Sequence, residues 1–214
     1  MKNFDFVSHT SWKGKIYLSS FPGLNEQKLF DHEEMEQTLK SISRLGCKCI
    51  ISLVEHHEIE DICGLNHFTH QLDKHDFTWH HFPIKDYEIP DKTFMVNWEK
   101  KHVGLLNGLI NGSNLFIHCK GGIGRSGTVA AMFLIVSGME NEQSILEVRS
   151  KRQGAIENEK QENFVGSFDP GNIFLMSPIR SKSPSRLLQI LIFLKLSDLK
   201  QRNSMRISAL RLRI

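Results

Sequence analysis

The stretch of sequence that decides the fold is HCKGGIGRSG, residues 118–127, in full His118-Cys119-Lys120-Gly121-Gly122-Ile123-Gly124-Arg125-Ser126-Gly127. Residues 114–119 lead into it, are rich in β-formers and predict a strand. Residues 128–136 follow it, are apolar on every side and predict a central buried helix. The sequence therefore places a glycine-rich turn between a strand and a helix.

A phosphoryl group is the ligand that this turn suits. It carries about two negative charges, and a glycine-rich turn can direct several backbone N–H groups into one concave site. The three glycines allow the backbone angles and the close approach that such a site needs, and the positive end of the following helix points to the same place. A guanidinium adds a planar fork for two phosphate oxygens. We therefore expect the phosphate-binding residues to be Lys120, Gly121, Gly122, Ile123, Gly124 and Arg125.

Cys119 is the expected nucleophile. A free thiol has a pKa of about 8.5, whereas thiols at helix N-termini fall to roughly 3.5–7.5 and so ionise. The thiolate can attack phosphorus and form a covalent phosphocysteine. We expect His118 to hold the cysteine backbone and sulfur in place, and Ser126 to donate a hydrogen bond to the departing sulfur. The alternative is a buried cysteine acting as a small hydrophobic side chain, which does not account for the glycines and the arginine beside it.

Strand and helix patterns alternate along the rest of the chain. Besides residues 114–119, strands are predicted at 15–20, 47–54 and 78–84. Besides residues 128–136, helices are predicted at 25–45, 92–110, 142–152 and 158–168, with helix plus loop at 55–75. This alternation predicts an α/β fold, in which a largely parallel central sheet is flanked by helices.

The composition changes near residue 168, which predicts a catalytic domain over residues 1–168 and a basic, weakly specified tail over 169–214. The tail has nine Lys/Arg and two Asp/Glu, a net charge of +7, whereas the remainder has 18 and 22, a net charge of −4. A mildly acidic main body argues against a nucleic-acid partner. Three interpretations of the tail stay open: a membrane-surface segment, a disordered extension, and a divergent or misread C-terminus.

The cysteines and histidines point to no disulfide framework and no metal. Four cysteines in 214 residues predict reduced thiols and a cytoplasmic setting with access to the nucleus. Cys47 and Cys49, expected on one face of a strand, have no second pair nearby, so burial is the favoured interpretation. The eleven histidines lack a spacing such as H-E-x-x-H. We expect no signal peptide and no membrane span.

The stretch 118–127 resembles the active-site loop of protein tyrosine phosphatases and dual-specificity phosphatases. The sequences HHFPIKD at residues 80–86 and GAI at 154–156, followed by Gln161, resemble the same superfamily. Within it the chain is most similar to the cyclin-dependent-kinase-associated phosphatase group. The resemblance covers about residues 10–165, leaves out the tail, and implies a protein-tyrosine-phosphatase-like fold.

The resemblance also implies roles for residues far from the loop. Asp86, on a mobile loop at 82–91, becomes the expected general acid; the alternatives are that it is a solvated turn residue, or that Asp91 is the acid rather than a helix N-cap. Gln161 is expected to position the hydrolytic water, with a surface glutamine on a helix as the alternative. Cys63 is a candidate for a protective disulfide with Cys119, a device of some related enzymes.

The expected activity is hydrolysis of phosphotyrosine and phosphoserine or phosphothreonine in proteins, without a cofactor. The resemblance implies, by analogy, phosphothreonine on the activation loop of a cyclin-dependent kinase. One alternative is a phosphoinositide phosphatase, for which Lys120 is suited but Ile123 stands where a second base would help. Another is a catalytically dead module that binds phosphoproteins, against which the presence of both Cys119 and Arg125 argues.

Overall fold

The computed structural model of the protein describes residues 4–25 and 27–171. Their strands form one five-stranded sheet in the order β1-β2-β5-β3-β4. The strands are β1 (Asp5–Val7), β2 (Ile16–Ser19), β3 (Cys47–Ser52), β4 (Thr78–His81) and β5 (Asn114–His118). β1 runs antiparallel to β2, and the other neighbouring strands run parallel, so the prediction of a mostly parallel sheet is confirmed.

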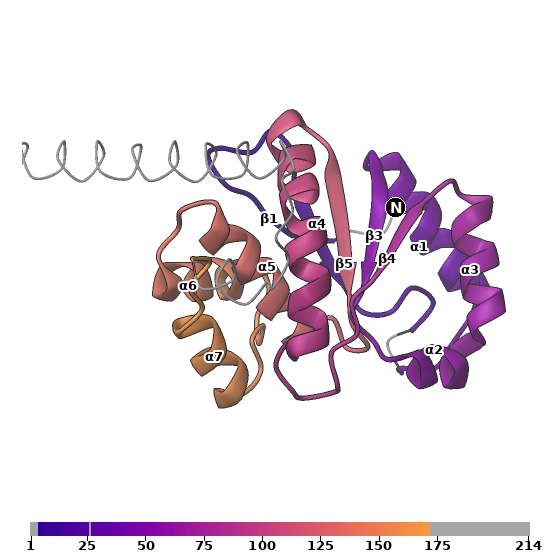
Figure 1. Cartoon of the computed structure of the whole chain (residues 1–214). Coiled ribbons are helices and arrows are strands. Elements are labelled where there is room, and N and C mark those ends of the chain that lie inside the picture. The colour runs from indigo at the N-terminus through magenta and orange to yellow at the C-terminus, as the bar shows by residue number, and fades with distance from the viewer. Residues whose placement is uncertain (1–3, 26, 172–214) are drawn as a thin grey trace, which may run out of the picture.

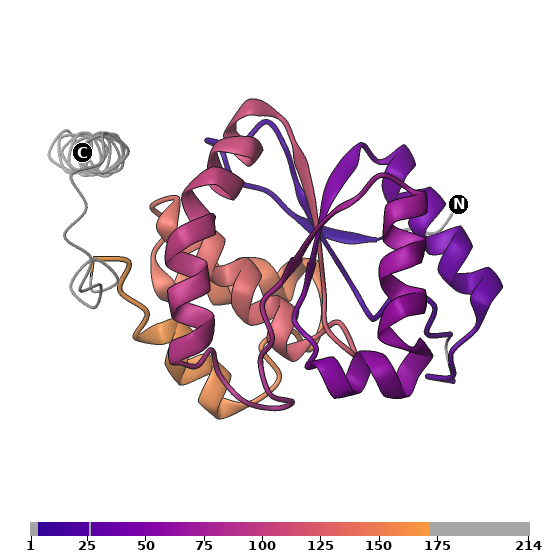
Figure 2. The ribbon, with the colours of Figure 1, turned by 45° about the vertical axis from the view of Figure 1, so that its right-hand side comes forward.

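Helices cover both faces of the sheet (Figures 1 and 2). One face carries α1 (His32–Arg44), α2 (His56–Cys63) and α3 (Leu65–Lys74). The other carries α4 (Lys92–Asn111), α5 (Gly124–Val136), α6 (Asn141–Lys151) and α7 (Glu159–Gly166). Successive strand side chains point to opposite faces, so Ile50 packs in the core beneath α1–α3 and Ile51 in the core beneath α4–α7.

The carboxyl ends of the parallel strands meet at one edge of the sheet. Ser19 at the end of β2 and Ser52 at the end of β3 both lie opposite His118 at the end of β5. The chain leaves β5 through the glycine-rich turn into α5, which is buried from Gly124 to Ile135 as its apolar sequence predicts. In open α/β sheets this edge is where ligands bind, so the fold exposes the turn there.

The helix predicted at residues 25–45 begins later, at His32. Lys28 takes a left-handed φ of 60°, which a continuous helix does not allow. Asp31 is the N-cap and accepts a hydrogen bond from the Glu34 N–H at 2.8 Å. This D-x-x-E pattern is a recognisable start signal, and it could have placed the boundary from the sequence.

Two further details differ from expectation. β1 was not predicted, because three residues show too little periodicity. The prediction that Cys47 and Cys49 share one face is wrong: the pairing of β3 with β5 shifts register between them, and they pack into the cores on opposite sides. Burial raises the pKa of each thiol to about 12, so both are protonated.

Residues 172–214 hold most of the predicted tail and lie outside the described residues, so the three interpretations of the tail stay predictions. Within the described ranges, no helix combines the length and apolarity that crossing a membrane requires. In the same ranges, no three or more His, Cys, Asp or Glu side chains are grouped so as to hold a metal ion.

Candidate active site

Cys119 lies at the floor of the glycine-rich turn, and its side chain is only 3% exposed. The Gly122 N–H donates a hydrogen bond to Cys119 Sγ at 3.0 Å, and the Ser126 hydroxyl lies 3.6 Å from the same sulfur. One backbone amide and one hydroxyl therefore face the sulfur from the turn and from the first helical turn of α5.

Gly122 can only be glycine in this conformation. Its φ is +72°, and a Cβ there would overlap the Ser19 carbonyl and the Ser20 nitrogen. A Gly122→Ala change should therefore destabilise the protein by at least about 1–3 kcal/mol, the cost of left-handed strain, and distort the turn. Urea unfolding and phosphate binding would measure this. Gly121→Ala is the control, because a Cβ there meets no atom within 4 Å; equal stability of the two variants would contradict the prediction.

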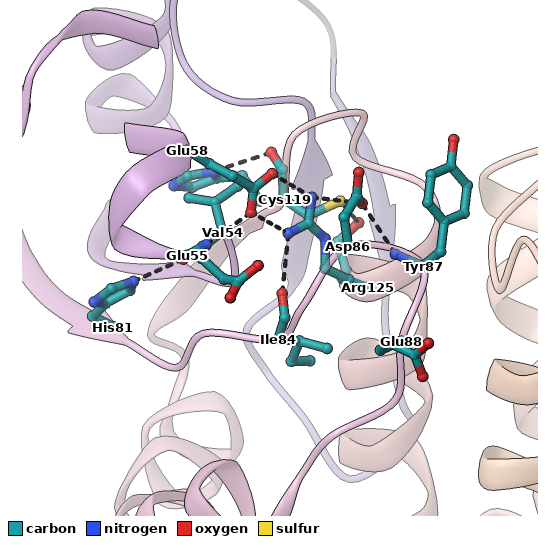
Figure 3. A network of polar contacts seen from close by, with 12 residues as sticks. Val54, Glu55, Glu58, His81, Ile84, Asp86, Tyr87, Glu88, Cys119 and Arg125 are labelled. Atoms are coloured by element: carbon teal, nitrogen blue, oxygen red, sulfur yellow. Dashed lines mark hydrogen bonds and ion pairs between the residues drawn. The ribbon is translucent and has the colours of Figure 1, made fainter. Parts of the chain in front are cut away.

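Arg125 is 1% exposed and is held on several sides (Figure 3). Its two terminal nitrogens bond the Glu58 carboxylate at 2.6 and 3.0 Å, and one of them also donates to the Ile84 carbonyl at 3.1 Å. Asp86 Oδ1 lies 2.9 Å from the other nitrogen. Burial lowers the pKa of Arg125, but Glu58, Cys119 and Asp86 outweigh burial and raise it, so the guanidinium stays charged beside the sulfur.

Glu58 is a site residue that the sequence did not identify. It lies in the first turn of α2, where its carboxylate also accepts the Glu55 N–H at 2.8 Å in a capping box. Burial raises the pKa of Glu58, but its hydrogen bonds with Arg125 and Glu55 reverse this and lower it. A glutamate is not among the usual N-cap residues, so E-x-x-E gave no clear helix-start signal, and nothing in the sequence links position 58 to position 125.

His118 is fully buried and neutral, because burial lowers its pKa to about 3. Trp79 Nε1 donates to the Ser52 hydroxyl oxygen at 2.8 Å, and that hydroxyl lies 2.6 Å from His118 Nε2. The Cys119 carbonyl, which can only accept, lies 3.3 Å from Nδ1, so the proton of the neutral ring is assigned to Nδ1 and the Ser52 O–H donates to Nε2. This chain of contacts fixes the ring against the backbone of Cys119.

A cleft of about 430 Å³ opens above the sulfur. It brings together Cys119 and Arg125 with Asp86, which is 46% exposed. It is also lined by residues that the sequence did not single out, from the segment before α1, the loop after Asp86 and the loop between α6 and α7: Ser20, Leu24, Asn25, Lys28, Tyr87 and Glu157.

The remaining candidates lie outside this cleft. Asp91 is the N-cap of α4 and accepts the Phe94 N–H at 2.7 Å, which confirms its interpretation as a helix cap. Gln161 is fully buried, so the surface-helix alternative is wrong; its Oε1 accepts the Glu157 N–H at 3.1 Å. Cys63 packs against the core beneath α1–α3, whereas Cys119 packs in the opposite core, and both are free thiols.

Comparison with known proteins identifies the domain. The family model described as "Swiss Army Knife protein, DSP-PTPase phosphatase domain" matches residues 27–165. The bovine protein tyrosine phosphatase type IVA 3 is 31% identical over 153 residues, covering 68% of this chain and 80% of that protein. A match to a protein of Invertebrate iridescent virus 6, 45% identical over 56 residues, spans only 26% of this chain and 21% of that protein.

Solved structures agree with this family. A kinase-associated phosphatase with its catalytic-site cysteine replaced by serine matches with a TM-score of 0.64 and 25% identity, over 76% of this chain and 91% of that one. The active form of Tk-PTP matches with a TM-score of 0.54 and 27% identity, over 73% and 94%. The expected protein-tyrosine-phosphatase-like fold is thereby confirmed, and the chain belongs to the dual-specificity and protein tyrosine phosphatase family of cysteine-based phosphatases.

Proposed function

We propose that the chain is a dual-specificity protein phosphatase that hydrolyses phosphotyrosine and phosphoserine or phosphothreonine through a phosphocysteine on Cys119. The observation that carries the proposal is the buried Cys119 sulfur facing the Gly122 amide, in one cleft with the charged Arg125. A phosphate dianion in this cleft meets a positive guanidinium and backbone N–H groups, with the sulfur beneath the phosphorus.

The residues divide the reaction between them. The Cys119 thiolate attacks phosphorus, the bond from phosphorus to the substrate oxygen breaks, and Asp86 gives its proton to that oxygen. In the structure Asp86 contacts the Arg125 guanidinium. A bound phosphate takes the place of Asp86 on the guanidinium, so Asp86 is free to meet the leaving group. Ser126 supports the sulfur. In the second step water attacks phosphorus, Asp86 accepts the proton of the water, and the phosphorus–sulfur bond breaks to give inorganic phosphate and the Cys119 thiolate.

The test is phosphate release by the purified protein from phosphotyrosyl and phosphothreonyl peptides in the presence of EDTA. Turnover of both substrates is the expected result, because no step uses a metal. Turnover that EDTA abolishes, or equal turnover by the wild type and Cys119→Ser, would contradict the mechanism.

Asp86→Ala should reduce kcat by roughly 10²–10⁴-fold, the usual contribution of a general acid, while substrate binding stays largely intact. Steady-state kinetics with a phosphopeptide would measure both. Asp91→Ala is the matched comparison: it removes the cap of α4, costing about 0.5–2 kcal/mol of stability, and should leave kcat unchanged. A greater loss of kcat in Asp91→Ala would reverse the assignment of the acid.

The second candidate is a phosphoinositide phosphatase, favoured by one observation. Lys28 lines the cleft together with Lys120, so a second base is present although Ile123 is not one. The carboxylate of Glu157 in the same cleft works against a polyanionic headgroup. Faster release of phosphate from a phosphoinositide panel than from phosphopeptides would favour this candidate.

For partners and location, we propose a phosphorylated protein substrate in the cytoplasm, with access to the nucleus. The structure of a kinase-associated phosphatase is among the similar ones, which supports a kinase as the substrate. The choice of a cyclin-dependent kinase and a role in the cell cycle rest on the sequence resemblance. Trapping with Cys119→Ser in cell extract, followed by identification of the retained phosphoprotein, would test this.

A further inference from the structure

Asp86 lies at the corner of a tight turn. The Glu88 N–H donates to the Lys85 carbonyl at 3.0 Å, so this segment forms a hydrogen-bonded β-turn with Asp86 and Tyr87 at its two central positions. Tyr87 has a left-handed φ of 59°, which a residue other than glycine keeps only where neighbouring contacts enforce it. The direction of the Asp86 carboxylate therefore depends on what holds the backbone of Tyr87.

The N-terminal end of α7 holds this turn through three side chains. Asn158 Nδ2 donates to the Tyr87 carbonyl at 3.0 Å. The buried Gln161 donates from Nε2 to the Glu88 carbonyl at 3.4 Å. Lys160 Nζ forms an ion pair with the Glu88 carboxylate at 2.7 Å, but this pair is exposed and contributes little by itself. The hydrogen bond from Asn158 is the one that acts directly on the left-handed residue.

Asn158 uses both ends of its side-chain amide. Its Oδ1 accepts the Gln161 N–H at 3.0 Å and thereby caps α7. An amide N–H needs an acceptor and a carbonyl needs a donor, so only this orientation of the amide satisfies both the Gln161 N–H and the Tyr87 carbonyl. The cap therefore fixes the group that donates to the turn.

The segment before Asn158 is itself held in place. The Arg149 guanidinium donates to the carbonyls of Ala155 and Ile156 at 3.1 and 2.9 Å. These bonds hold Ile156 at a left-handed φ of 57° and direct the next residue, Glu157, to the cleft that it lines. The helix that follows, α7, packs against α5 and α6. Asn158 thus holds the turn from a part of the chain that the core and Arg149 keep in position.

We propose that Asn158 is a positioning residue for the general acid: by holding the Tyr87 carbonyl, it keeps the Asp86 carboxyl directed at the leaving group. This rests on the proposed function, in which Asp86 gives its proton to the substrate oxygen. A general acid must lie within about 2.6–3.2 Å of the atom that it protonates, and a misplacement of about 1 Å can cost about 10²-fold in rate. A bound phosphate removes the contact of Asp86 with Arg125, whereas the bond from Asn158 does not involve the carboxylate and remains.

Two substitutions separate this role from the helix cap. Asn158→Asp and Asn158→Ser both keep an oxygen for the Gln161 N–H, because aspartate and serine are good N-cap residues. An ionised aspartate has no proton to donate to the Tyr87 carbonyl, and a serine is too short to reach it while it caps the helix. Thermal unfolding of the full chain should therefore stay close to that of the wild type. Asn163→Asp, the same change at an exposed position of α7, is the matched control.

The measurement is kcat/KM for phenyl phosphate, whose leaving group needs a proton, and for para-nitrophenyl phosphate, whose leaving group departs readily without one. This ratio reports the steps up to release of the phenol, so hydrolysis of the phosphocysteine does not enter it. In both Asn158 variants, kcat/KM for phenyl phosphate should fall about 10-fold, part of the roughly 10²–10⁴-fold contribution of a general acid. The value for para-nitrophenyl phosphate should stay near that of the wild type. Asp86→Ala should show the same selectivity more strongly, and Asn163→Asp should show none.

The outcomes distinguish the inference from the function on which it rests. Wild-type values with both substrates, or an equal loss with both, would overturn the role of Asn158 and leave the phosphatase function intact. A selective loss in Asn158→Asp alone would also overturn it, because the added charge and not the missing hydrogen bond would be the cause. A wild-type protein that releases phosphate from neither substrate would overturn the phosphatase function, and the inference with it.

Discussion

Cys119→Ser is expected to abolish turnover of para-nitrophenyl phosphate and of phosphopeptides while the protein stays folded and still binds phosphate. A serine hydroxyl is un-ionised near neutral pH, so it cannot replace a thiolate as nucleophile. It is close in size to the thiol and can still accept the Gly122 N–H, so the turn and Arg125 stay in place. Steady-state kinetics, thermal unfolding and calorimetric titration with a phosphopeptide would measure the three properties.

Cys63→Ser is the matched control for this variant. Cys63 is a free, half-buried thiol at the end of α2, and a serine there can donate to the Gly64 carbonyl as the thiol does at 3.7 Å. It should retain wild-type turnover. Residual turnover in Cys119→Ser, or the same loss in Cys63→Ser, would show that the nucleophile has been assigned wrongly.

Glu58→Ala is expected to lower the free energy of unfolding by about 3–5 kcal/mol, the usual cost of removing one member of a buried ion pair, although Asp86 still contacts Arg125. Arg125 is 1% exposed and would lose both hydrogen bonds to the carboxylate, at 2.6 and 3.0 Å. Its guanidinium would also lose its orientation toward the cleft, so phosphate binding should weaken. Urea denaturation gives the stability, and titration with a phosphopeptide gives the binding.

Acidification gives this prediction a second readout. The folded-state pKa of Glu58 is lowered from the ordinary value of 4.5, so its contribution to stability is full above about pH 4.5 and is lost as the pH falls through the lowered value. The difference between Glu58→Ala and the wild type should therefore shrink in strong acid. Asp61→Ala, an exposed carboxylate on the same helix, should change stability by at most about 0.5 kcal/mol at any pH. Loss of the same size in both variants would contradict the prediction.

Local sequence patterns predicted the strand, turn and helix that carry Cys119 and Arg125. The turn from β5 into α5 is contiguous in sequence, so the position of Cys119 above a buried helix followed from residues 114–136. Asp86 lies 33 residues earlier, and only the resemblance singled it out; the structure places it in the same cleft. The partners of Arg125 could not be predicted, because Glu58 is 67 positions away and its pairing depends on how α2 packs at the sheet edge.

The weakest prediction concerned the loop before α7. Nothing in the sequence shows whether a glutamine in a helix is buried. Gln161 was therefore predicted either to position water in the cleft or to lie on the surface. It is buried, and it does not line the cleft. The left-handed Ile156 that directs Glu157 to the cleft has no sequence signal either, since β-branched residues rarely adopt this conformation. The long helix predicted at 25–45 failed for a similar reason at Lys28.

The contact between Arg125 and Glu58 joins two parts of the molecule that otherwise pack separately. Arg125 comes from α5, which lies in the core on one face of the sheet, whereas α2 contributes Ile59 to the core on the other face. This ion pair thus crosses the boundary between the two cores at the phosphate-binding turn. A protein that docked against the outer surface of α2 and shifted this helix would move Glu58 and tilt the Arg125 guanidinium. Such a partner would change phosphate binding without contacting the cleft.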